Sequence, residues 1–254
     1  MDLSVPAVTL AGLLLATCRA AGFVLLAPPF NSRGIPAPVK GALALALAVA
    51  VLHRITPGLP EPTPGFLVVT AVTEVAIGAG LGFIVQVLFT AVQMAGDILD
   101  VTGGFSLSPA YDPLAMTMTS NIGRLHYMLG TALLFTSGGD LVIVRGFATS
   151  YDGLPVGASL PTGQLASVLM TALSMMFLAA LQIAGPMVAV LLLADVALAL
   201  LSRASPALNI FQLGFPVKIM LCLALLGLSF PLLPSALDTL VEHAVRAVVS
   251  LKAG

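Results

Sequence analysis

Hydrophobic residues along the chain gather into six long runs, which short polar or proline-rich stretches separate. Each run reaches or approaches the ~20 residues that an α-helix needs to cross ~30 Å of hydrocarbon. Leucine and alanine dominate most runs, which favours helices over the alternating pattern of a transmembrane β-barrel. The pattern therefore predicts an all-α membrane protein with about six long, proline-kinked apolar helices. The runs are Leu3–Leu26, Ile35–Leu52, Phe66–Ala95, Ile122–Phe147, Gln164–Leu201 and Leu213–Leu237, with a shorter amphipathic tail after them.

The fifth run is too long for one straight crossing of a membrane. About 38 residues at ~1.5 Å each give ~57 Å, nearly twice the thickness of the hydrocarbon core. Gly185-Pro186 lies near the middle of this run, where proline removes an internal hydrogen bond and kinks a helix. Two alternatives stay open: two short helices that meet at Gly185-Pro186, or one bent helix that extends far beyond the membrane.

The composition agrees with a membrane protein and excludes several classes. The chain has 254 residues, of which 59% are hydrophobic and 8% charged, whereas an average soluble domain carries about 25% charged residues. A soluble globular enzyme is thereby excluded. The net charge of −1 offers no basic patch for nucleic acid. Cys18 and Cys222 both lie within apolar runs, which excludes a disulfide framework or a zinc site.

Four charged residues lie within the apolar runs: Arg19, Glu74, Asp195 and Lys218. Each costs at least ~2.5–3.5 kcal/mol to insert, so each needs a compensating interaction. They could form a proton or ion pathway, or they could pair with each other, with partner subunits or with the membrane interface. No run carries the repeated acidic or histidine spacing of a proton relay, which favours pairing. Lys40 and Lys218 each follow Pro-Val in the first turn of a predicted helix, where the helix dipole disfavours a cation. Lipid phosphate or an acidic partner should compensate them.

Asp97 and Asp100 form an Asp-x-x-Asp pair on one face of the third run, near its end. Paired carboxylates bind a divalent metal in membrane phosphatidyltransferases. Those enzymes also need a glycine directly after the second aspartate, an Ala-Arg pair and a second Asp-x-x-x-Asp. Val101-Thr102 follows here instead, and the other elements are absent. We therefore expect a polar face at a helix end and no metal site.

Residues 102–121 form a long connection that cannot be a continuous helix, because Gly103-Gly104, Ser108-Pro109 and Asp112-Pro113 interrupt it. Loops of this length are usually functional. Its composition is apolar, so it must pack against something, and methionine and aromatic side chains adapt to irregular gaps. Either it plugs a pore or cleft, or it is a re-entrant loop that packs only on its own chain. The residues expected to form the plug are Phe105, Leu107, Tyr111, Asp112, Pro113, Met116 and Met118.

The most specific pattern in the chain is Arg203-Ala204-x-Pro206-x-x-Asn209-x-Phe211, between the fifth and sixth runs. Gly185-Pro186 through Leu193-Ala194-Asp195 precedes it, and Leu213-Gly214-Phe215-Pro216-Val217-Lys218-Ile219 follows it. In this order and spacing, these residues strongly resemble the FliR family of the bacterial type III flagellar export gate.

Three further stretches agree with that family: Ile35-Pro36 with Val39-Lys40, Ala95-Gly96 through Asp100 to Gly104-Phe105-Ser106, and Ser150-Tyr151 with Leu154-Pro155. Asp112-Pro113 also matches, since an Asp-Pro closes this loop in the family. Gly139-Asp140 departs from it, because relatives often carry Gly-His there. That pair lies outside the gate elements. The similarity therefore covers most of the chain.

The resemblance implies a non-enzymatic subunit without cofactor or metal. It would assemble with FliP-like and FliQ-like subunits into a pore through which unfolded flagellar proteins cross the bacterial inner membrane. FlhB-like and FlhA-like proteins, the export substrates and membrane lipid are further expected partners, and nucleic acid is not. The complex would lie in the flagellar basal body, with part of it protruding on the periplasmic side.

The resemblance also implies how the single export-gate domain, residues 1–254, is organised. Residues 1–160, including the 102–121 plug loop, would form a FliP-like part, and residues 161–254 a FliQ-like helical hairpin. Gly185 and Pro186 are the expected helix kink. The residues expected to contact partner subunits are Lys40, Glu74, Asp97, Asp100, Asp195, Arg203, Pro206, Asn209 and Lys218.

Two other functions compete with this one. An injectisome export protein of the same superfamily needs the same gate, so only the neighbouring genes would separate it from a flagellar protein. A small secondary transporter belongs to a different class. It would use Glu74, Asp195 and Lys218 near the middle of the membrane and would work alone or as a homo-oligomer.

Overall fold

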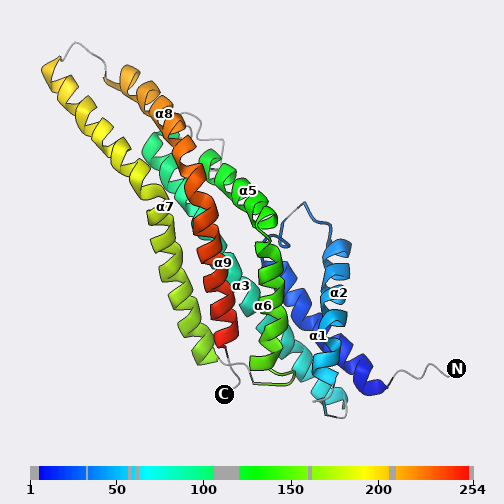
Figure 1. Cartoon of the computed structure of the whole chain (residues 1–254). Coiled ribbons are helices and arrows are strands. Elements are labelled where there is room, and N and C mark those ends of the chain that lie inside the picture. The colour runs from blue at the N-terminus through cyan, green and yellow to red at the C-terminus, as the bar shows by residue number, and fades with distance from the viewer. Residues whose placement is uncertain are drawn as a thin grey trace. The chain divides into compact units, whose positions relative to one another are not determined.

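The computed structural model describes residues 6–32, 34–56, 59–60, 63–105, 120–159, 162–205 and 210–251, without the side chains of residues 210–213. Within these ranges the regular structure is helical, with no strand, as the sequence predicts. The helices follow one another along the chain as Figure 1 shows. They are α1 (Ala7–Leu26), α2 (Ala37–Ile55), α3 (Pro64–Gly103), α5 (Asn121–Thr136), α6 (Gly139–Gly153), α7 (Thr162–Ala204), α8 (Ile210–Ser229) and α9 (Leu233–Ser250), with a 3₁₀ turn over Phe230–Leu232.

Two predicted runs differ from the helices that form. The third run was expected to end at Ala95, but α3 continues to Gly103 and is 40 residues long. Polar side chains in its last turns, such as Asp100 and Thr102, form hydrogen bonds within the protein and so can be part of the helix. The fourth run was expected as one helix, but it divides into α5 and α6. Gly138 adopts a φ of 74° between them, a left-handed conformation that glycine adopts at little cost.

The fifth run forms one unbroken helix of 43 residues, α7, with Pro186 inside it. Of the two alternatives, a single helix longer than the membrane is therefore the one observed. The sixth run continues beyond its expected end. The Phe230–Leu232 turn links α8 to α9, and Pro231 within it has no N–H to continue the α-helical hydrogen bonds.

Among the described residues, five helical stretches are long and apolar enough to cross a membrane, or six if α5 and α6 together count as one crossing. They are α1, α2, α3, α7 and the stretch Gly214–Ser250, which combines most of α8 with α9. This agrees with the predicted number of about six.

The described residues form two compact units, each built from separate parts of the chain. The first unit contains α1, α2, the first part of α3, α6, the start of α7 and the end of α9. The second contains the last part of α3, α5, most of α7, α8 and the start of α9. Since α3, α7 and α9 contribute to both units, we describe each polar site within one unit.

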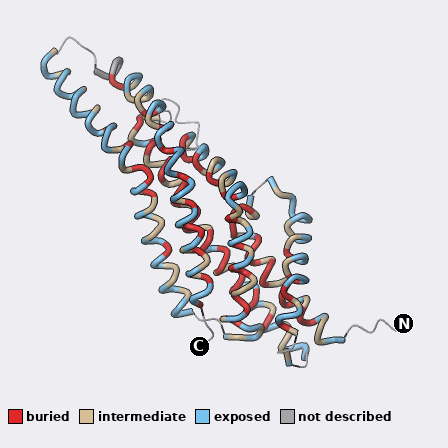
Figure 2. The backbone as a smooth tube through the Cα atoms, in the orientation of Figure 1, coloured by how far each residue is buried: buried red, intermediate tan, exposed pale blue. Residues whose placement is uncertain are grey.

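Burial is uneven along the helices, as the red and pale blue segments of Figure 2 show. In the most apolar stretch of α3, 61% of the residues are buried, whereas in that of α7 only 22% are. α3 is therefore a central element of the protein's own core. α7 instead leaves most of its apolar surface for contacts outside this chain.

Candidate functional site

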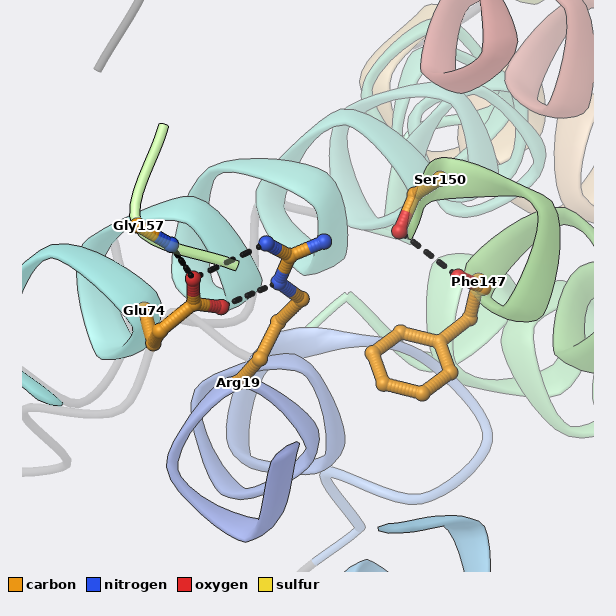
Figure 3. A network of polar contacts seen from close by, with 5 residues as sticks. All are labelled: Arg19, Glu74, Phe147, Ser150 and Gly157. Atoms are coloured by element: carbon orange, nitrogen blue, oxygen red, sulfur yellow. Dashed lines mark hydrogen bonds and ion pairs between the residues drawn. The ribbon is translucent and has the colours of Figure 1, made fainter. Parts of the chain in front are cut away.

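A buried ion pair joins α1 to α3 in the first unit (Figure 3). Arg19 Nε donates to Glu74 Oε2 at 2.5 Å, and Arg19 Nη2 donates to Glu74 Oε1 at 3.0 Å. Both side chains are 0% exposed. This two-point geometry matches the guanidinium fork to the carboxylate and gives strong, charge-assisted hydrogen bonds. The two charges thus neutralise each other inside the protein.

Two further groups complete the surroundings of this pair. The backbone N–H of Gly157 donates to Glu74 Oε1 at 3.3 Å, and the Tyr151 ring lies 4.0 Å from Arg19 Cζ. The Nη1 atom of Arg19 has no hydrogen-bond partner among the described residues. The cation–π contact with the Tyr151 ring offsets part of the cost of burying this guanidinium group. The pair consequently ties together α1, α3, α6 and the segment that follows α6.

Glycines bring α1 and α3 close enough for this ion pair. A Cβ atom on Gly78 would collide with the backbone carbonyl oxygen of Arg19, and one on Gly22 with that of Val75. A Cβ atom on Gly82 would lie 2.7 Å from the carbonyl oxygen of Phe23. Real Cβ atoms essentially never approach backbone this closely. Only glycine at these positions permits the observed helix contact.

Aromatic rings shield the same region. The rings of Phe23 and Phe147 lie 4.8 Å apart, and those of Phe147 and Tyr151 lie 5.7 Å apart, edge to face. Ser150 Oγ donates to the carbonyl oxygen of Phe147 at 2.6 Å, as Figure 3 shows. Apolar surroundings of this kind strengthen the Arg19–Glu74 attraction and make an unpaired charge there costly.

A second ion pair lies in the second unit, between α7 and α8. Lys218 Nζ is 2.8 Å from Asp195 Oδ1 and 2.9 Å from Asp195 Oδ2. The Lys218 side chain is 16% exposed and that of Asp195 is 47% exposed. The expectation that these four charged residues pair with each other is thus confirmed for both pairs. The expected place of Lys218 in the first turn of its helix is wrong, because α8 begins at Ile210 and contains Pro216, so that Lys218 lies in the third turn. Lys40 is compensated differently, since its Nζ donates to the carbonyl oxygen of Asn31 at 3.1 Å.

Asp97 and Asp100 lie where the end of α3 meets the start of α5. Asp100 Oδ1 accepts a hydrogen bond from the N–H of Ile122 at 3.3 Å, and the Asp97 carboxylate accepts one from the Ser120 hydroxyl. Within the described residues, no group of three His, Cys, Asp or Glu side chains could hold a metal ion. These carboxylates instead contact the N-terminus of a neighbouring helix.

The remaining predicted site residues fall into two groups. Phe105 and Arg203 are described, and Arg203 is exposed in the last turn of α7. The others lie outside the described residues: Leu107, Tyr111, Asp112, Pro113, Met116 and Met118 of the plug loop, and Pro206 and Asn209. Tyr151 and Gly157 were not predicted as site residues. A sequence pattern does not show which aromatic ring or backbone N–H will lie beside a charge that is distant in the chain.

Comparison with known proteins identifies the family of this chain. The model of the family described as bacterial export proteins, family 1, matches residues 10–244. Flagellar biosynthetic protein FliR of Escherichia coli K12 is 32% identical over 85% of this chain and 82% of its own length. FliR of Bacillus subtilis 168 is 29% identical over 81% of each chain.

A relative from a different apparatus also matches. Secretion system apparatus protein SsaT of Salmonella typhimurium LT2 is 33% identical over 62% of this chain and 61% of its own length. The family match, the length of the FliR alignments and the membrane-length helices agree with one another. The chain belongs to the bacterial export proteins, family 1, the family of flagellar biosynthetic protein FliR.

Proposed function

We propose that this protein is a subunit of the flagellar type III export apparatus in the bacterial inner membrane. With FliP-like and FliQ-like subunits, it forms the pore through which unfolded flagellar proteins leave the cytoplasm. The observation that carries the proposal is the family match over residues 10–244. Relatives named as flagellar biosynthetic proteins span more of the chain, 85%, than the secretion system relative, 62%, which favours the flagellar apparatus.

The exposed surface of α7 and α8 supports a multi-subunit complex. Large apolar side chains point outward along both helices, around the neutralised Asp195–Lys218 pair. An apolar surface of this size must meet lipid or protein, and neighbouring subunits would cover much of it. The most exposed of these side chains are Met220 at 72%, Leu193 at 69%, Met170 at 67% and Leu228 at 64%.

The internal organisation follows from the same proposal. Residues 1–160 form the FliP-like part and residues 161–254 the FliQ-like hairpin, whose two arms the Asp195–Lys218 pair joins. FlhB-like and FlhA-like proteins are the remaining partners, and part of the complex protrudes on the periplasmic side. Arg203, exposed at the end of α7, is available to a neighbouring subunit.

The secondary transporter gains no support from the polar groups that it would use. Glu74 is fully buried and accepts hydrogen bonds from Arg19 and Gly157. Asp195 is paired with Lys218. A carboxylate that binds and releases ions must lose such partners in each cycle, whereas a structural ion pair keeps them.

We expect the tagged chain, extracted in mild detergent, to co-purify with FliP-like and FliQ-like subunits in a constant ratio. The physical reason is that the apolar faces of α7 and α8 are stable only when lipid or protein covers them. Mass spectrometry of the intact complex measures the ratio. An unrelated inner-membrane protein with the same tag is the control. A stable chain that elutes alone would contradict the proposal.

We expect deletion of residues 107–116 to leave the complex assembled but to make the membrane leaky to ions and small solutes. This segment carries most of the residues of the proposed plug, and a pore without its plug stays open. Ion conductance of cells or proteoliposomes measures the leak, and co-purification of the partner subunits measures assembly. Normal assembly with unchanged conductance would rule out the plug.

A further inference from the structure

The ion pair between α7 and α8 leaves the carboxylate of Asp195 partly open. Lys218 Nζ contacts both of its oxygens, at 2.8 and 2.9 Å. The Lys218 side chain is only 16% exposed, whereas that of Asp195 is 47% exposed. An ionised carboxylate can accept about four hydrogen bonds, and one ammonium group does not use them all. Asp195 therefore keeps acceptor capacity on its exposed side.

The surface of α7 around Asp195 is apolar in both directions along the helix. The exposed apolar side chains that precede and follow it are Leu192, Leu193, Val196 and Leu200, each more than half exposed. From the first to the last of them, the helix rises by about 12 Å. Figure 2 shows this end of α7 mostly in pale blue. Asp195 thus lies within an exposed apolar surface and not at its edge.

This combination limits what can cover the surface. Water would leave the leucine side chains exposed, which is unfavourable. Lipid tails would cover the leucines but offer no hydrogen-bond donor to the carboxylate, and such burial is costly in hydrocarbon. Lipid headgroups lie beyond the apolar layer, whereas apolar side chains flank Asp195 on both sides. A helix of another protein satisfies both needs, because it can present apolar side chains together with one donor.

The charge balance indicates the kind of donor. Asp195 and Lys218 carry opposite charges, so together they are already neutral. A lysine or arginine from a partner would leave one net positive charge inside an apolar contact, where unpaired charge is strongly unfavourable. A hydroxyl or carboxamide group donates a hydrogen bond without adding charge, and such groups join apolar helices in membranes.

We propose that Asp195 is the acceptor site for a neutral donor side chain, a hydroxyl or a carboxamide, on an apolar helix of a neighbouring subunit. Lys218 neutralises the carboxylate from within the chain, and the donor of the neighbour occupies its exposed side. The inference rests on the proposed function, because the helix that carries the donor belongs to another subunit of the export apparatus.

Two variants without charge test the acceptor in the intact complex. Asp195→Leu/Lys218→Met has no acceptor at position 195, whereas Asp195→Asn/Lys218→Met keeps an acceptor oxygen there. Relative to the Asn variant, we expect the fraction of the Leu variant that co-purifies with other subunits to fall by about threefold to twentyfold, the effect of one hydrogen bond between helices in a membrane. The amount of each variant in the membrane normalises this fraction.

A second measurement identifies what lies opposite Asp195. A photo-reactive amino acid in place of Val196, the next exposed residue of α7, should form an adduct with an apolar helix of a neighbouring subunit. We expect the adduct peptide to contain Ser, Thr, Asn or Gln. Adducts with lipid alone would overturn the proposal. A contact helix whose only donor side chains are Lys or Arg would overturn the neutral donor.

Glu242→Leu/Arg246→Met is the matched control, because it removes another exposed ion pair, on α9. The exposed neighbours of that pair include the polar residues Asp238 and Thr239, so we expect no change in co-purification. Equal co-purification of the Leu and Asn variants of Asp195, in a complex that assembles, would overturn the acceptor site alone. A wild-type chain that elutes without other subunits would contradict the proposed function, and the acceptor site would fall with it. If neither variant of Asp195 reaches the membrane, the adducts at position 196 of the otherwise unchanged chain decide the matter.

Discussion

Replacing Glu74 with leucine is expected to destabilise the protein by about 3–5 kcal/mol, because it leaves the Arg19 guanidinium buried without its counter-ion. Both side chains are 0% exposed, so water cannot take the place of the lost carboxylate. Tyr151 would still cover one face of the guanidinium, which offsets only part of the cost. Thermal unfolding of the purified complex and the amount of chain in the membrane measure the effect.

The double variant Arg19→Met/Glu74→Leu should be compared with the Glu74 single variant, because it removes both charges together. Replacing a buried ion pair by apolar residues of similar size is often neutral, so this variant should recover much of the lost stability. Glu242→Leu is the control, because Glu242 pairs with Arg246 on an exposed face and such pairs contribute ~0–1 kcal/mol. Equal stability of the Glu74 and Glu242 variants would show that the buried pair has no structural role.

Replacing Gly78 with alanine is expected to cost about 1–3 kcal/mol or more, as overpacking of a rigid contact does. The added Cβ would meet the carbonyl oxygen of Arg19, which is backbone and cannot rotate away. α1 and α3 must then separate, which also weakens the Arg19–Glu74 hydrogen bonds. Thermal unfolding of the complex measures the loss.

Gly41→Ala is the matched control, since Gly41 lies in α2 and no atom is within 4 Å of its built Cβ. There the substitution should stabilise the helix by about 0.5–1 kcal/mol, the usual gain of alanine over glycine in a helix interior. If both variants change the stability alike, close approach of α1 and α3 is not what requires glycine at position 78.

Helix type and approximate number could be predicted from the sequence, but several ends could not. The end of α3 illustrates the reason. A hydrophobic pattern ends when polar residues begin, yet Asp97, Asp100 and Thr102 continue the helix, because Thr102 Oγ1 donates to the carbonyl oxygen of Ile98 at 2.8 Å and the aspartates contact α5. Such partners come from the tertiary structure, which a local pattern does not contain.

For the candidate site, the sequence could identify the charged residues but not the partner of each one. An arginine or a glutamate within an apolar run is conspicuous because of its insertion cost, so Arg19 and Glu74 could be selected from sequence. Their pairing could not, because the two residues are 55 positions apart and Glu74 had equally plausible partners in other subunits.

The sequence by itself determined the class and the family of this protein. Long apolar runs with few charges can be stable only as helices in lipid or against other subunits, and ordered motifs along the chain identify the export family. Only the tertiary structure decided the partner of each charged residue. Arg19 pairs with Glu74 inside the core, and Lys218 pairs with Asp195 between α7 and α8. Asp97 and Asp100 of α3 accept hydrogen bonds from residues at the start of α5. The physical reason is that insertion cost depends on residue type, whereas compensation depends on which backbone and side chains lie within hydrogen-bonding distance, and glycines at the helix crossings set those distances.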